Sequence, residues 1–97
     1  MAAKWQSNAN KAIKDSRKML KKGASIGEII DLIKDMTKLK NEGTKYDDIP
    51  SKNVLKMLLL FQAKIFKLGT QLGADLASMR AKSNFYVDHP VYGRLRY

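Results

Sequence analysis

Residue types with recognisable chemistry are scarce in this sequence of 97 residues, which has no cysteine and a single histidine, His89. The missing cysteine excludes a disulfide framework, a thiolate metal site and a cysteine nucleophile. His89 has no second histidine at metal-ligand spacing, and the sequence has no glycine-rich phosphate loop. We therefore expect no enzyme activity, no metal and no cofactor.

Long hydrophobic runs are also missing. The longest uninterrupted apolar run is the five residues from Met57 to Phe61, whereas a helix needs about 20 such residues to cross a bilayer. A transmembrane helix is therefore not expected. No secretory signal peptide is recognisable, so secretion is not indicated, and the sequence favours no particular cell compartment.

Acidic residues are few compared with basic ones. Nine Asp and Glu stand against 19 Lys and Arg, which gives a formal net charge of +10. This balance favours an anionic partner such as nucleic acid, an acidic protein surface or anionic lipid, although charge of this kind also serves solubility alone. Fifteen of the 19 basic residues are Lys. Because bidentate base contacts prefer Arg, sequence-specific DNA recognition is not expected.

The N-terminal segment, about residues 4–22, is predicted to form an amphipathic basic helix. At about 100° per residue, Trp5, Ala9 and Ile13 share one arc. The opposite arc carries seven candidate anion-binding residues: Lys4, Lys11, Lys14, Arg17, Lys18, Lys21 and Lys22. Three interpretations stay open: a core helix with a solvated lysine face, a helix that binds nucleic-acid phosphates, and a helix that lies on an anionic membrane surface.

A second helix is predicted over about residues 25–41. Ser25 and Glu28 have the spacing of a capping box, in which each side chain bonds to the backbone N–H of the other. Apolar residues from Ile29 onward form one face, and the opposite face mixes acidic residues with lysines. We interpret this helix as structural.

A third helix is predicted over residues 51–83, where apolar residues recur every three or four positions without a proline. Either Asp48 or Ser51 can serve as its N-cap. At about 1.5 Å per residue it would be roughly 45 Å long. We expect it to be the spine of the fold and to extend beyond its two shorter neighbours.

The distal half of this third helix has small residues at every fourth position: Gly69, Gly73, Ala77 and Ala81. Such a series lets another backbone approach closely. Each helix-interior glycine costs about 1 kcal/mol relative to alanine, so a compensating contact is expected. That contact is either with another helix of this chain or with another subunit.

Residues 84–97 differ in composition and are predicted to form an extended arm. Pro90 and Gly93 argue against a helix, and four aromatic residues and two arginines lie within these 14 positions. Tyr and Arg dominate binding hot spots, so the arm either binds a partner or folds back over the third helix. The candidate protein-binding residues are Gly69, Gly73, Leu76, Ala77, Phe85, Tyr86, Tyr92, Arg94, Arg96 and Tyr97.

A helical hairpin with Leu59, Gln62 and a small-residue helix after it is loosely similar to the needle and inner-rod subunits of type III secretion systems. The similarity covers at most residues 51–83 and rests on common residue types. The strong basic charge and the aromatic tail depart from that family. No residue is therefore assigned a role from it.

These patterns predict an all-α fold, either a small three-helix bundle or a helical hairpin with one long C-terminal helix. Residues 1–83 form one helical domain, and residues 84–97 form the aromatic arm. The expected function is that of a non-enzymatic structural or adaptor subunit, which docks onto other protein subunits in a homo- or hetero-oligomer. The alternative is nonspecific binding of the nucleic-acid backbone by the N-terminal helix, and peripheral membrane-surface binding is third.

Overall fold

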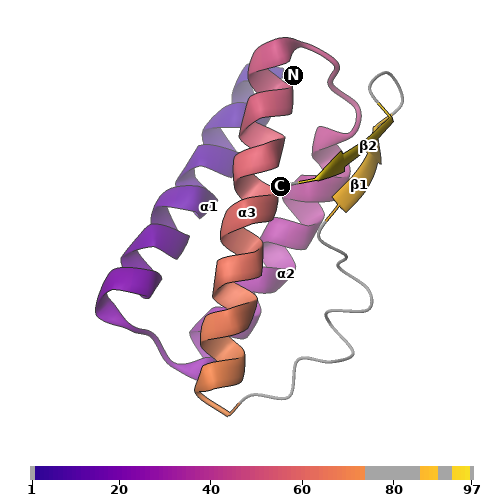
Figure 1. Ribbon diagram of the computed structural model, residues 1–97. Coiled ribbons are helices and arrows are strands. Elements are labelled where there is room, and N and C mark those ends of the chain that lie inside the picture. Colours follow the sequence, from indigo (N-terminus) through magenta and orange to yellow (C-terminus); the bar gives the residue numbers. More distant parts are fainter. Residues whose placement is uncertain (1, 74–85, 90–92, 97) are drawn as a thin grey trace.

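Three helices pack side by side around one apolar core in the computed structural model, which describes residues 2–73, 86–89 and 93–96 (Figure 1). They are α1 (Ala2–Lys22), α2 (Ile26–Gly43) and α3 (Ile49–Gln71). The predicted all-α bundle is therefore confirmed, with three helices rather than two.

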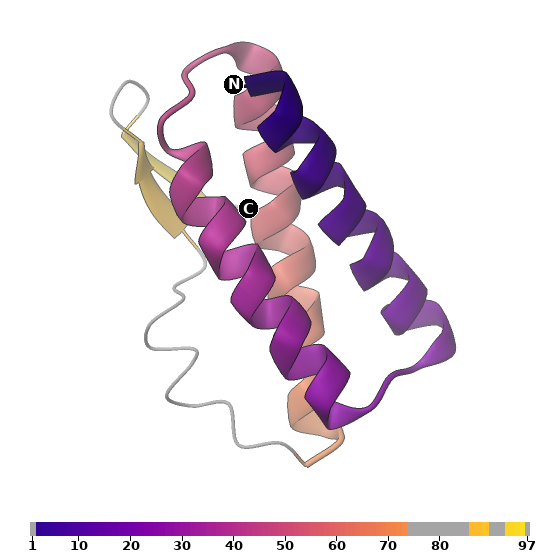
Figure 2. The same ribbon diagram turned by 180° about the vertical axis from the view of Figure 1, so that it is seen from behind.

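Helices α1 and α3 run in the same direction, and α2 runs against both (Figures 1 and 2). Contacts between α1 and α3 follow this order. Near the start of both helices, the Gln6 side-chain amide donates to Ser51 Oγ at 2.8 Å. Further along, the guanidinium of Arg17 lies over the ring of Phe61. Residues at corresponding positions along α1 and α3, counted from the start of each helix, are therefore neighbours.

Hydrogen bonds at the helix starts confirm the predicted capping box and identify the second cap. At α2 the Glu28 N–H donates to Ser25 Oγ at 3.2 Å, and the Ser25 N–H donates to Glu28 Oε1 at 3.1 Å. At α3 the N-cap is Asp48, whose Oδ2 accepts from the Ser51 N–H at 3.0 Å. Backbone and side-chain hydrogen bonds from Ser25 lower the pKa of Glu28, and side-chain and backbone hydrogen bonds from Ser51 lower the pKa of Asp48.

The predicted extent of the third helix is wrong, because α3 ends at Gln71 and not at Ser83. The Leu72 N–H donates to the carbonyl oxygen of Gly69 at 3.2 Å. Gly73 then has a φ of +90°, in the left-handed region that glycine adopts at little cost. A left-handed glycine directly after the last turn is a common helix stop.

This early end removes two expected features. Gly73 lies outside the helix, so it forms no small-residue ridge with Gly69, and Ala77 and Ala81 lie outside the described residues. With 23 residues against 21, α3 is also about as long as α1. Within the described residues, α3 therefore does not extend far beyond its neighbours.

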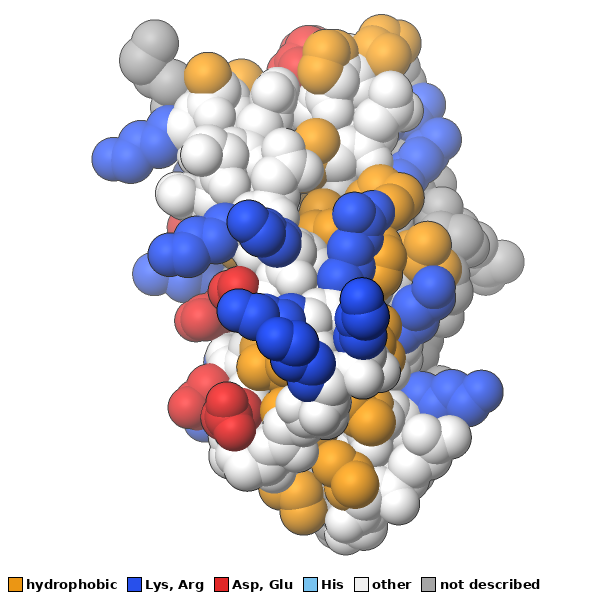
Figure 3. Space-filling model, turned by 90° about the vertical axis from the view of Figure 1, so that its left-hand side faces the viewer, with side chains coloured by type: hydrophobic (Ala, Val, Ile, Leu, Met, Phe, Trp, Pro, Cys, Tyr) orange, Lys and Arg blue, Asp and Glu red, His pale blue; other side chains and the backbone are white. Residues whose placement is uncertain are grey.

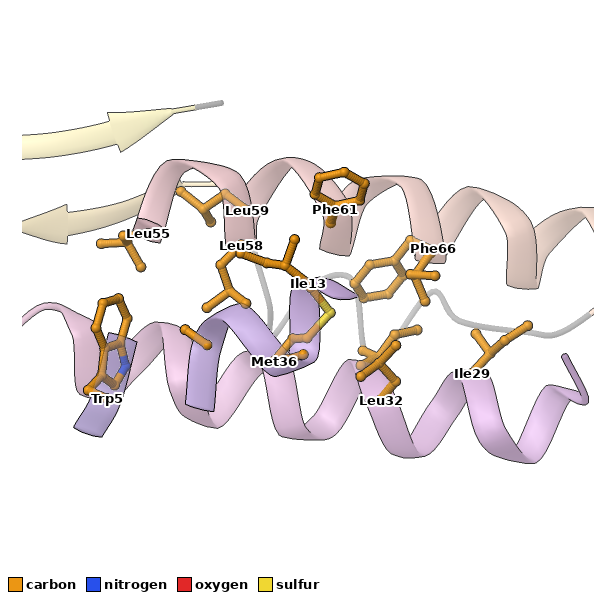
Figure 4. Packing of buried hydrophobic residues seen from close by; sticks show 14 residues of the cluster. Trp5, Ile13, Ile29, Leu32, Met36, Leu55, Leu58, Leu59, Phe61 and Phe66 are labelled. Atoms are coloured by element: carbon orange, nitrogen blue, oxygen red, sulfur yellow. The ribbon is translucent and has the colours of Figure 1, made fainter. Parts of the chain in front are cut away.

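All three helices contribute to the buried core (Figure 4). Its hydrophobic members are Trp5, Ala9, Ala12, Ile13, Ile29, Leu32, Ile33, Met36, Leu55, Leu58, Leu59, Phe61, Ile65 and Phe66. In Figure 4, Trp5 lies at one end of the row of labelled side chains and Ile29 at the other.

Trp5 connects the start of α1 to the end of α2 through a hydrogen bond and ring packing. Its indole Nε1 donates to the Leu39 carbonyl oxygen at 2.8 Å, and its ring lies 5.7 Å from that of Tyr46, centroid to centroid. A Cβ atom at Gly43 would overlap the indole ring. The last turn of α2 therefore needs a residue without a side chain where the indole lies against it.

A buried polar cluster joins α2 to α3 inside the core. The Gln62 amide nitrogen donates to the Ile33 carbonyl oxygen at 3.1 Å and to Thr37 Oγ1 at 2.8 Å. The amide oxygen of Gln62 accepts from Lys40 Nζ at 3.1 Å. Burial disfavours the charged form of the amine and lowers the pKa of Lys40 to about 8.

The last two described segments are the strands β1 (Tyr86–His89) and β2 (Gly93–Arg96). They pair antiparallel, with Tyr86 opposite Arg96 and His89 opposite Gly93. The extended conformation predicted for residues 84–97 is therefore present in both segments, and their pairing is additional to that prediction.

Candidate functional site

Exposed basic residues from α1 and α3 lie on neighbouring helices. All seven candidate anion-binding residues of α1 are exposed. Helix α3 contributes the exposed Lys56, Lys64 and Lys67 and the half-buried Lys52, and it contains no acidic residue. Figure 3 shows Lys and Arg side chains across the middle of this face and at both edges, with hydrophobic side chains between some of them and acidic side chains mainly toward the left edge.

A groove of about 490 Å³ runs between α1 and α3. Four polar residues line it. Lys14, Arg17 and Asn10 come from α1, and Asn53 comes from α3. Three apolar residues, Ile13, Val54 and Met57, form the rest of its lining. We call this site the α1–α3 groove, and none of the residues that line it is acidic.

Two cations meet over one aromatic ring beside this groove. The Arg17 guanidinium carbon and Lys64 Nζ each lie 5.0 Å from the centroid of the Phe61 ring. The ring itself is almost fully buried, at 7% exposed. Attraction between each cation and the ring quadrupole favours this placement. Phe61 thus holds a basic side chain from α1 near one from α3.

The opposite flank of α1 has a different charge. Two adjacent hollows of about 400 and 360 Å³ lie between α1 and α2 and share Asp15, Leu32 and Asp35. We call them together the α1–α2 groove. Its acidic lining residues are Asp15, Glu28, Asp31, Asp35 and Glu42, and its basic ones are Lys11, Lys18, Lys22 and Lys38. Phosphates would meet repulsion there as well as attraction.

The seven candidate anion-binding residues of α1 therefore do not share one site. Of the seven residues, Lys14 and Arg17 line the α1–α3 groove, and Lys11, Lys18 and Lys22 line the α1–α2 groove. The contribution of Lys64 was missed. Lys64 lies seven residues after Met57 and three after Phe61, so all three share one side of a helix. This spacing could have predicted that Lys64 lies near the groove.

Among the predicted protein-binding residues, the structure pairs Tyr86 with Arg96 across β1 and β2 and places Gly69 and Gly73 at the end of α3. Gly69 is buried in α3, and Gly73 is exposed at the helix end. Tyr86, Arg94 and Arg96 lie in the two strands. The remaining candidates, Leu76, Ala77, Phe85, Tyr92 and Tyr97, lie outside the described residues.

An apolar feature that the sequence did not reveal lies at one end of the bundle. Helices α1 and α3 end there and α2 begins there (Figure 1). Three large hydrophobic residues are exposed on these helix ends: Leu20 at 38%, Ile26 at 39% and Leu72 at 47%.

The described residues offer neither a metal cluster nor a membrane span. Among them, no group of three or more His, Asp or Glu side chains is arranged to hold a metal ion. No described helix is long and apolar enough to cross a membrane. No protein-family model matches this chain, and neither a curated protein nor a solved structure matches it significantly. The similarity to type III needle and inner-rod subunits therefore gains no support.

Proposed function

We propose that this protein binds the phosphate backbone of nucleic acid, without reading its sequence, through the basic face of α1 and α3. One observation carries the proposal. The parallel helices α1 and α3 place Arg17 and Lys64 over the Phe61 ring, beside a groove that is lined by Lys14 and Arg17 and contains no carboxylate.

The positive charge of this face suits a nucleic-acid backbone. Duplex DNA carries one negative charge per about 1.7 Å of its axis, and neutralising phosphates releases condensed counterions. The exposed lysines of α1 and α3 are flexible point charges that follow a backbone without fixed geometry. The predominance of Lys therefore supports phosphate contacts and not base-specific contacts.

Membrane-surface binding is less well supported by the same helices. An interfacial helix inserts its apolar face about 5–10 Å into the boundary between headgroups and acyl chains. The apolar face of α1 is instead committed to the core, with Trp5 at 3% and Ile13 at 5% exposed. Insertion of α1 would require the bundle to open.

Fluorescence anisotropy with labelled mixed-sequence DNA and RNA 20-mers, titrated with salt, tests the proposal. If about five phosphates are neutralised, log K should fall against log[salt] with a slope of about −4.5 for duplex DNA. The triple variant Lys14→Gln, Arg17→Gln, Lys64→Gln should flatten this slope by about 2.7. A slope near zero for the unmodified protein would overturn the proposal.

The matched control is the triple variant Lys34→Gln, Lys38→Gln, Lys45→Gln. It removes the same charge from exposed lysines of α2 and the following loop. Equal losses in both triple variants would mean that only net charge matters, which would contradict a defined face. Flotation with phosphatidylserine-containing vesicles completes the test, because vesicle binding without DNA binding would assign the face to membranes.

A second proposal is the docking of another protein subunit, as a structural or adaptor component of an assembly. The exposed Leu20, Ile26 and Leu72 at one end of the bundle favour it. Sedimentation velocity on the full chain should then show self-association that is lost in the double variant Leu20→Gln, Leu72→Gln and after deletion of residues 85–97. A monomer at every concentration would contradict self-association.

A further inference from the structure

The α1–α3 groove contains apolar surface that phosphate binding does not use. Ile13 is buried, and Val54 and Met57 are half-buried, so part of the lining is hydrocarbon next to solvent. Pockets for organic ligands combine an apolar lining with a few polar groups and have volumes of about 300–1,000 Å³. With about 490 Å³, this groove has that composition and size.

Arginine occurs at one position in residues 2–73, and that position lines the groove. Every other basic residue of the three helices is a lysine. A lysine supplies charge to a phosphate as well as an arginine does, whereas the planar guanidinium also stacks on aromatic rings. Arg17 already lies over Phe61, 5.0 Å from the ring centroid. It is exposed, so it remains accessible to a ligand in the groove.

Two asparagines lie in the groove with this arginine, Asn10 from α1 and Asn53 from α3. Both side chains are exposed. An amide both donates and accepts hydrogen bonds, which is the capacity needed to bind the edge of a nucleobase. A phosphate offers acceptors only, so it would use only half of this capacity.

We propose that the α1–α3 groove holds an unpaired nucleobase, which stacks on the Arg17 guanidinium against the apolar lining while Lys14 and Lys64 contact the neighbouring phosphates. This inference rests on the proposed function and specifies its substrate as single-stranded nucleic acid. Unpaired bases stack on aromatic rings and on Arg guanidinium planes. A base inside a duplex is paired and stacked, and cannot enter the groove without leaving the helix.

Affinities for a labelled 20-nucleotide single strand and for its duplex, measured at one salt concentration, test the inference. The single strand should bind about tenfold more tightly, which is within the effect of one stacked base. Arg17→Lys keeps the charge and removes the planar group. It should therefore bring the ratio of single-strand to duplex affinity, measured with the same variant, most of the way to one.

A swap variant, Arg17→Lys with Lys18→Arg, is the matched control. It keeps composition and charge but moves the guanidinium to a residue that lines the α1–α2 groove. We expect it to behave like Arg17→Lys alone. Restoration of the single-strand preference by the swap would overturn the assignment to the α1–α3 groove.

The side-chain amide NMR signals of Asn10 and Asn53 give a direct readout of the groove. They should shift on addition of the single strand and stay in place on addition of inorganic phosphate. Shifts of the same size with both probes would mean that the groove binds phosphate and not a base.

The outcomes separate this inference from the proposed function. Equal affinity for single strand and duplex would overturn the inference and leave phosphate-backbone binding standing. An unchanged preference in Arg17→Lys would likewise overturn it. Loss of all nucleic-acid binding from the unmodified protein would overturn both.

Discussion

The two grooves that flank α1 use basic residues from the same helix in different surroundings. Lys14 and Arg17 line the groove toward α3, which has no acidic residue in its lining, whereas Lys18 and Lys22 line the groove toward α2 among carboxylates. Each hollow of the α1–α2 groove, of about 400 and 360 Å³, is comparable in volume to the α1–α3 groove of about 490 Å³. The clearest difference between the two flanks is therefore the charge of the lining. Arg17 and Lys18, one position apart on α1, therefore have different chemical surroundings, because a different neighbouring helix supplies the opposite wall of each groove.

The largest effect is expected from a substitution that weakens the packing of α1, the helix that both grooves share. Trp5→Ala removes the ring that packs α1 against the end of α2 and the hydrogen bond to the Leu39 carbonyl. Large-to-small substitution of a buried aromatic costs about 3–5 kcal/mol, a large fraction of the stability of a small domain. Urea denaturation followed by circular dichroism measures the loss. Leu20→Ala, at a side chain 38% exposed, is the control and should cost much less.

Charge reversal in one groove at a time tests the comparison directly. Lys14→Glu with Arg17→Glu should weaken nucleic-acid binding by at least about tenfold at 0.1 M salt, because two phosphate contacts become repulsive. Lys18→Glu with Lys22→Glu changes the net charge equally on the other flank and should weaken binding less. Anisotropy titrations measure the nucleic-acid affinity of both variants. Equal losses of affinity would contradict a binding role specific to the α1–α3 groove.

A pH effect is expected from the contact that positions α3 against α2. Burial lowers the pKa of Lys40 from 10.5 to about 8. Between these two pH values the unfolded chain keeps a proton that the folded protein has released, so raising the pH favours folding. The free energy of unfolding should therefore rise from pH 8 to pH 10.5 by about 1–3 kcal/mol relative to Lys40→Met.

Urea denaturation of both proteins across this range measures the Lys40 effect. All other residues are identical in the two chains, so the difference isolates Lys40. A difference that does not change with pH would contradict the assignment of this shift to burial.

The smallest effect is expected from making the grooves more alike. Asp15→Asn with Asp35→Asn removes two carboxylates that line both hollows of the α1–α2 groove. The surface potential becomes more positive, which should raise the association rate with nucleic acid about twofold at low salt. Stopped-flow anisotropy measures this rate. Asp47→Asn is the control, because this exposed residue lies in the loop before α3.

Local patterns were sufficient to predict the helices and much of the core. Four of the five buried positions of α1, Trp5, Ala9, Ala12 and Ile13, follow from apolar spacing, because one face of a helix must pack against something. The fifth, Ser16, is polar and does not follow from it. The capping box of α2 was predictable because its two hydrogen bonds join residues three apart. Both signals depend on interactions within a few residues, which the sequence displays directly.

The end of α3 was not predictable in this way. Gly73 follows Gly69 by four residues, and apolar residues continue beyond both. The same glycine fits a close-packed helix interior and a left-handed stop. Only the backbone conformation, with a φ of +90°, distinguishes the two.

The candidate site was predictable only in part. Sequence identified Lys14 and Arg17 as exposed basic residues, because the α1 pattern separates a polar face from an apolar one. It did not separate them from Lys18 and Lys22, because that division depends on which helix packs on each flank. It also did not bring Lys64 to Arg17, since a contact between residues so far apart in sequence is created by the fold.

The position of Trp5 gives this protein a built-in optical reporter. It is the single tryptophan of the chain, and its ring is buried at one end of the bundle. Arg17 lies twelve positions further along α1, about 18 Å along the helix. Because the Trp5 ring is buried, its emission should be blue-shifted in the folded protein and change on unfolding. A base stacked on Arg17 should leave that emission nearly constant, so one fluorescence channel can monitor folding while a labelled oligonucleotide monitors binding.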